Sequence, residues 1–162
     1  MNINNQEVTE FLYREAWCLD NKRWDDWLEM YAADAIYWAP AMVGDEGWTN
    51  DPDNEVSLMY MDRAGLDARI FRIEGEDSYA TEPLPHTSHL VTNVLNHGER
   101  DGLIEVSATW MVRSYVRVRG RISRGGIYEY RLRPTCDGLR IVRKKIFIHD
   151  DRVVGPIDIY NI

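Results

Sequence analysis

Residues 11–41, FLYREAWCLDNKRWDDWLEMYAADAIYWAPA, predict two amphipathic helices followed directly by a strand. Apolar residues recur at helical spacing over 8–19, and the i, i+3, i+4, i+7 spacing returns over 24–31 after a break at Asp20–Asn21. Each helix therefore has one apolar face to bury. The strand over 35–38 is the first part of the sheet that these faces would cover.

The rest of the chain predicts a third helix and a series of long strands. Pro40 ends the first strand, because proline cannot donate to a ladder, and 57–60 predict a short strand. Asp62 is suited to cap a third helix with Leu66, Ile70 and Ile73 on one face. Four long strands follow, over 87–97, 103–119, 121–133 and 139–149.

The strand over 103–119 shows the clearest alternation. Its even positions from Ile104 to Val118 are mostly apolar and its odd positions are mostly polar, so one face belongs to the core. Gly125–Gly126 predict a bulge or bend in the next strand. Strands this long must twist and curl. We therefore expect an α+β, NTF2-like (cystatin-like) cone over residues 1–162 as a single domain, with three N-terminal helices packed on a strongly curved, mainly antiparallel sheet.

Composition indicates a globular cytoplasmic protein. The chain has 162 residues, 44% of them hydrophobic, with six Trp and nine Tyr, which excludes a disordered chain. A mean hydropathy of −0.45 and the lack of a long apolar run predict no membrane span. The polar, acidic start does not resemble a signal peptide, and Cys18 and Cys136 are expected to be free thiols.

Charge is divided along the chain. Residues 1–82 carry 19 acids and 6 bases, whereas residues 83–162 carry 8 acids and 13 bases. The overall charge of −8 and the spread of the bases along alternating strands argue against nucleic acid as a partner. A solvated sheet face and a protein interface both stay open. If the basic side is an interface, we expect self-association through Arg113, Arg117 and Arg119.

No residue pattern predicts a metal or catalytic centre in this chain. A Rieske cluster needs two Cys and two His in close pairs, and a mononuclear oxygenase iron needs two His with a carboxylate. The sequence offers neither set. An alternative is a solitary dehydratase or isomerase that uses acid–base groups inside the cone. Its candidate residues would be His86, His89, Asp20, Tyr60 and Asp62.

Four stretches resemble a known family in their actual residues, and not only in their pattern of polar and apolar positions. These are the opening 11–41, RAGLDARIFRI at 63–73, PHTSHLVTNV at 85–94 and the tail IDIYNI at 157–162. Together they resemble the small (β) subunit of Rieske-type aromatic-ring-hydroxylating dioxygenases, above all the benzoate and anthranilate branch. One departure is His86, at a position where relatives often carry arginine.

The resemblance implies a structural subunit without cofactors of its own. Three β subunits would associate with one another and with three large α subunits. The α subunit would hold a Rieske [2Fe–2S] cluster and a mononuclear Fe(II), and NADH-derived electrons would reach it through an FAD-containing iron–sulfur reductase. The complex would hydroxylate an aromatic carboxylate, with benzoate, anthranilate, salicylate and halobenzoates all open.

Three arginines on the predicted third helix are candidates for the contact with α. Arg63, Arg69 and Arg72 lie within ten residues in an otherwise acidic half of the chain. Arg69 and Arg72 are i, i+3 neighbours that can together bind a carboxylate. A solvated helix face is the alternative interpretation.

Overall fold

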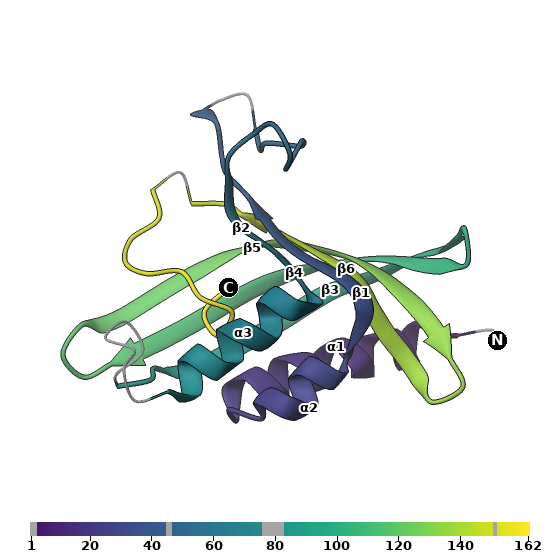
Figure 1. Ribbon diagram of the computed structural model, residues 1–162, viewed down its shortest axis with the longest axis horizontal. Coiled ribbons are helices and arrows are strands. Elements are labelled where there is room, and N and C mark those ends of the chain that lie inside the picture. Colours follow the sequence, from purple (N-terminus) through teal and green to yellow (C-terminus); the bar gives the residue numbers. More distant parts are fainter. Residues whose placement is uncertain (1–2, 45–46, 76–82, 151) are drawn as a thin grey trace.

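The computed structural model describes residues 3–44, 47–75, 83–150 and 152–162, in which three helices pack on one six-stranded sheet (Figure 1). The elements in chain order are α1 (Asn5–Asp20), α2 (Trp24–Glu29), β1 (Tyr31–Pro40), β2 (Ser57–Asp62), α3 (Arg63–Glu74), β3 (His86–Arg100), β4 (Leu103–Val116), β5 (Gly120–Thr135) and β6 (Gly138–Ile148). The α+β class is thus confirmed.

The sheet has the strand order β2-β1-β6-β5-β4-β3. Only β1 and β6 pair in parallel; the other neighbours within this sheet are antiparallel. Figure 1 shows the long strands twisting strongly and curling over the helices, which lie together on one side. This confirms the curved, mainly antiparallel sheet.

Local side-chain hydrogen bonds start two of the helices. Asn4 accepts a hydrogen bond from the Glu7 amide at 3.0 Å, and Glu7 accepts one from the Asn4 amide at 2.8 Å, which completes a capping box for α1. Asp62 caps α3 by accepting from the Gly65 amide at 2.7 Å, as the sequence predicts. In the described part of the chain, none of the helices combines the length and apolar character needed to cross a membrane.

The core lies between the helices and the inner sheet face. Leu66, Ile70 and Ile73 of α3 are buried, as predicted. The inward positions of β4 from Ile104 to Val112 are also buried, which confirms the alternation. Trp110 stacks on Tyr128 of the neighbouring strand, with ring centroids 4.9 Å apart. Bulky side chains therefore fill the cone.

Tyr31 and Val118 lie outside the elements to which the sequence pattern assigns them. Tyr31 is not the last residue of a helical stripe but the first residue of β1, because it pairs in parallel with Ile141 of β6. Val118 is not in the core: β4 ends at Val116, and a turn closed by the Arg119 amide and the Val116 carbonyl leaves Val118 79% exposed. In both places the backbone hydrogen bonds set the structure, although the spacing of apolar side chains predicts otherwise.

The bulge that the sequence allows at Gly125–Gly126 is absent, because β4 and β5 pair through this point without a register shift, whereas a bend there stays a prediction. The two glycines are needed for close packing of backbones instead. A Cβ on Gly125 would lie 2.9 Å from the Trp110 carbonyl oxygen, and one on Gly126 would collide with the Phe147 carbonyl. Only glycine fits between the neighbouring strands here.

Candidate functional site

The C-terminal tail closes the cone from the helix side. After β6 the chain turns back and ends beside α3 (Figure 1). Ile159, Tyr160 and Ile162 are at most 1% exposed, so the tail packs as part of the core. The stretch 157–162, the last of the four that resemble the family, therefore fills this end of the core, and we call it the C-terminal plug.

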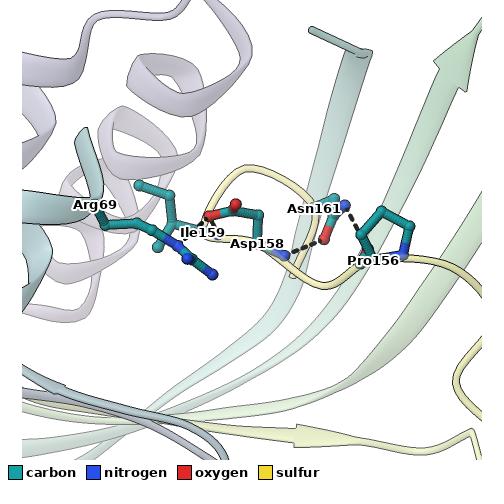
Figure 2. Close-up of polar contacts among 5 residues, drawn as sticks. All are labelled: Arg69, Pro156, Asp158, Ile159 and Asn161. Atoms are coloured by element: carbon teal, nitrogen blue, oxygen red, sulfur yellow. Dashed lines mark hydrogen bonds and ion pairs between the residues drawn. The ribbon is translucent and has the colours of Figure 1, made fainter. Parts of the chain in front are cut away.

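A self-contained turn shapes this plug (Figure 2). The Asp158 amide donates to Asn161 Oδ1 at 2.9 Å, and the Asn161 amide donates to the Asp158 carbonyl at 3.0 Å. Asn161 Nδ2 also donates to the Pro156 carbonyl at 3.1 Å. These bonds satisfy polar groups that would be costly to bury unpaired.

Arg69 of α3 holds the turn in place. Its Nε lies 3.0 Å from Asp158 Oδ1, which also accepts from the Ile159 amide at 2.8 Å (Figure 2). Burial raises the pKa of Asp158, and the charge of Arg69 opposes that rise. The contact joins two of the resembling stretches, 63–73 and 157–162.

The three candidate arginines of α3 are thus placed differently. Arg69 contacts the tail of its own chain, Arg72 is exposed in the last turn and Arg63 is half-buried in the first turn. The contact of these side chains with an α subunit stays a prediction. Arg63 and Arg72 are the better candidates for it, because Arg69 is already paired with Asp158.

Arg124 of β5 also binds the C-terminal tail. Its Nη2 donates to the Val154 carbonyl at 2.5 Å and to the Pro156 carbonyl at 3.1 Å. The side chain is buried, and this burial lowers the pKa of Arg124. Sequence reasoning missed it, although position 124 has the same parity as the inward-facing Tyr128 and Tyr130, which was an available signal.

A buried ionic cluster lies deeper in the cone. Lys144 Nζ of β6 lies 2.9 Å from Glu15 Oε1 of α1, and both side chains are at most 3% exposed. Tyr31 and Tyr130 donate to the same carboxylate at 2.7 and 2.8 Å. Lys144 Nζ also lies 4.1 Å from the centroid of the Tyr128 ring, a cation–π contact.

The cluster keeps its charges by mutual compensation. Burial opposes ionisation of Glu15, but the charge and hydrogen bond of Lys144 and the two tyrosine hydrogen bonds outweigh it and lower the pKa of Glu15. Burial lowers the pKa of Lys144, and Glu15 opposes that fall. Sequence reasoning missed Glu15, although it lies at helical spacing from the buried Leu12 and Leu19.

Asp20 and His89, two of the five acid–base candidates, meet in the structure. His89 Nδ1 lies 2.6 Å from Asp20 Oδ1, and the His89 amide donates to Asp20 Oδ2 at 2.8 Å. Burial opposes ionisation of Asp20, but these hydrogen bonds and the charge of His89 lower its pKa overall. The pair joins the end of α1 to β3.

The other three candidates lie elsewhere. His86 is exposed at the start of β3, Tyr60 is 45% exposed on β2, and Asp62 is used as the cap of α3. The structure therefore brings together one hydrogen-bonded pair and not the whole predicted acid–base set.

Metal ligands do not converge in the described residues. No group of three or more His, Cys, Asp or Glu is close enough there to hold an ion. Cys18 is buried and Cys136 is exposed, and both are free thiols. His97 Nε2 is hydrogen-bonded to Ser107 at 2.7 Å.

The basic candidates lie around the β4–β5 hairpin. Arg113 is exposed on the outer face of β4, opposite Ser123. Arg117 and Arg119 are exposed in the turn beyond the end of β4, and not on the strand where the sequence placed them. Their role in self-association stays a prediction.

Comparisons with known proteins agree with this architecture. The family described as "Ring hydroxylating beta subunit" matches residues 14–154. The chain is 38% identical to benzoate 1,2-dioxygenase subunit beta of Acinetobacter baylyi, over 99% of this chain and 95% of the relative. It is 37% identical to toluate 1,2-dioxygenase subunit beta of Pseudomonas putida, over 100% of both.

Solved structures give the same result. The beta subunit of benzoate 1,2-dioxygenase from Burkholderia mallei superposes with a TM-score of 0.81 at 34% identity, covering 100% of this chain and 99% of that one. An NTF2-like protein with a cystatin-like fold from Novosphingobium aromaticivorans has a TM-score of 0.62 at 18% identity, covering 91% and 82%. The second match confirms the predicted NTF2-like fold, and the first favours the subunit interpretation over the solitary enzyme.

Proposed function

The chain belongs to the family of ring-hydroxylating dioxygenase β subunits, and from this premise we propose that it is the non-catalytic β subunit of an oxygenase that hydroxylates an aromatic carboxylate. The observation that carries the proposal is the full-length similarity to the subunits of benzoate and toluate 1,2-dioxygenases. Benzoate, anthranilate, salicylate and halobenzoates are the substrates to test.

The side chains that the structure describes do not fit either iron centre. A Rieske cluster needs two Cys and two His, yet Cys18 is buried in α1 and Cys136 is exposed beyond β5. His89 is engaged by Asp20, and the described residues bring no third ligand near it. We assign the Rieske [2Fe–2S] cluster and the mononuclear Fe(II) to the α subunit, and FAD and NADH to the reductase.

The role of this chain is then to supply a rigid base. Its cone is filled by stacked aromatic rings, held by the Glu15–Lys144 cluster and closed by its own tail. A chamber packed in this way presents a fixed outer surface to partners. We propose that three such subunits associate with one another and with three α subunits in the cytoplasm, where free thiols such as those observed persist.

The test is to purify the chain alone and together with the α subunit that the proposal requires. The isolated chain is expected to bind no iron, and the complex to contain iron and to turn over one of the four carboxylates. Metal analysis and optical spectra give the readout. Stoichiometric iron in the isolated chain that is lost in His86→Ala or in His89→Ala would refute the structural role.

The α contact has a separate test on α3. Arg63→Ala with Arg72→Ala removes two arginines without touching the Arg69–Asp158 contact. We expect the β fold to persist, while co-purification with α and hydroxylation fall together, since truncating a desolvated interfacial charge pair costs about 2–5 kcal/mol. Unchanged assembly and turnover would return both arginines to the solvated face.

A further inference from the structure

A groove with exposed aromatic side chains runs along α1. Its volume is about 940 Å³, and it is bounded by α1, α2 and the turn between β5 and β6. Tyr13 and Trp17, four residues apart on α1, are 51% and 56% exposed at this groove. Exposed aromatic side chains of this size are typical anchors of protein interfaces.

The groove is also acidic. Five carboxylates and two arginines contribute to its lining. Among the described residues, Glu10, Glu29 and Asp137 form no ion pair. A binding partner for this surface should therefore combine positive charge with an apolar tip.

The β4–β5 hairpin of the same chain has this chemistry. Arg113, Arg117, Arg119 and Arg121 are all exposed, and none forms an ion pair within the part of the chain that the structure describes. Val118, at the tip, is 79% exposed. The hairpin thus offers several uncompensated guanidinium groups around one apolar side chain.

One chain cannot bring its own hairpin into its own groove. The groove includes Asp137, Gly138 and Leu139 at the C-terminal end of β5, whereas the hairpin tip lies at its N-terminal end. A strand of 16 residues separates them by about 50 Å at ~3.3 Å per residue. Figure 1 shows the tip at the left end of the molecule and the β5–β6 turn at the right end, near the N-terminus.

We propose that the groove receives the β4–β5 hairpin of a second copy of this chain. Val118 packs against Tyr13 and Trp17, and Arg117 and Arg119 pair with Glu10 and Glu29. The contact is head-to-tail, so it joins two different patches, and a closed ring of three copies satisfies all of them. The inference rests on the self-association included in the proposed function and names its surfaces.

Charge reversal tests the pairing in sedimentation experiments on the isolated chain. Arg117→Glu with Arg119→Glu, and separately Glu10→Lys with Glu29→Lys, should each raise the dissociation constant of the trimer at least about 100-fold. The chain that carries all four changes should form the trimer again, because the charges are exchanged. Arg72→Glu with Arg152→Glu has the same charge change as the hairpin variant and should leave the trimer intact.

Circular dichroism confirms that each variant is folded. A wild-type chain that is monomeric at both low and high salt overturns this inference together with self-association. A wild-type trimer that survives both reversals, or a folded four-site variant that stays monomeric, overturns the pairing and leaves self-association standing. Loss of α binding with an intact β trimer would assign the hairpin or the groove to the α subunit and also overturn the inference.

Discussion

Arginines inside the cone and arginines on the β4–β5 hairpin differ in how their charges are met. Arg69 pairs with Asp158, and the buried Arg124 donates to the carbonyls of Val154 and Pro156. Arg117 and Arg119 are exposed and form no ion pair among the described residues. The inner arginines hold the chain to itself, whereas the outer ones are available to another chain.

The same distinction applies to the acids. Glu15 is fully engaged by Lys144, Tyr31 and Tyr130, while Glu29 lies open at the groove of α1. Buried charges are expected to affect folding strongly, since losing one partner leaves the other uncompensated. Exposed charges are expected to affect association and little else. Four variants test this division.

Lys144→Met should have the largest effect on stability. The change leaves the Glu15 carboxylate buried without its cation, which is expected to lower the free energy of unfolding by about 3–5 kcal/mol. Urea unfolding measures it. The matched control is Glu15→Met combined with Lys144→Met, which removes both charges and should cost less than Lys144→Met alone. A loss below about 1 kcal/mol for the single variant would contradict a structural role for the pair.

Glu15→Gln should change how stability depends on pH. The pKa of Glu15 is lowered from 4.5 in the folded chain, so its contribution is complete above pH 4.5 and is lost as pH falls through the folded value. The variant should therefore lose less stability than wild type on acidification. Asp158 acts in the opposite direction, because burial raises its pKa, but both chains contain it. Parallel curves from pH 7 to pH 3 would refute the assignment.

Arg69→Ala should loosen the tail and have an intermediate effect. It removes the cation from a carboxylate whose side chain is only 9% exposed, and because Arg69 itself is 26% exposed, the expected cost is about 1–3 kcal/mol. Hydrogen exchange of the 157–162 amides should rise more than that of β4. Arg72→Ala is the control: this exposed arginine of the same helix acts on Asp158 through its charge alone, so both quantities should change much less.

Much of this fold could be predicted from the sequence because its signals are local. The alternation in β4 and the cap at Asp62 depend only on neighbouring residues, and both predictions are confirmed. Tyr31 was misplaced because it continues a helical spacing, while its actual pairing is with Ile141, far along the chain. The spacing of apolar residues along the sequence could not show that Tyr31 would pair with a distant strand and not continue the helix.

The candidate site was less accessible from the sequence for the same reason. The sequence indicates that Arg69 can bind a carboxylate. It does not show that this carboxylate belongs to Asp158, which lies 89 positions away. Glu15 and Lys144 are 129 positions apart, and neither residue alone predicts the other. Only the topology, which places β6 beside β1 and brings the tail back to α3, joins these groups.

Arg117→Ala with Arg119→Ala should have the smallest effect on folding. Both side chains are exposed in a turn and form no ion pair among the described residues, so the free energy of unfolding of the dissociated chain should stay within about 0.5 kcal/mol of wild type. If these arginines bind the groove of a second copy, the same variant should still weaken the trimer, and unfolding should become less dependent on protein concentration than in wild type. Unfolding curves at two concentrations a hundredfold apart separate the two effects. A large loss of stability at the lower concentration would show that the hairpin arginines support the fold itself and would remove the distinction between inner and outer charges.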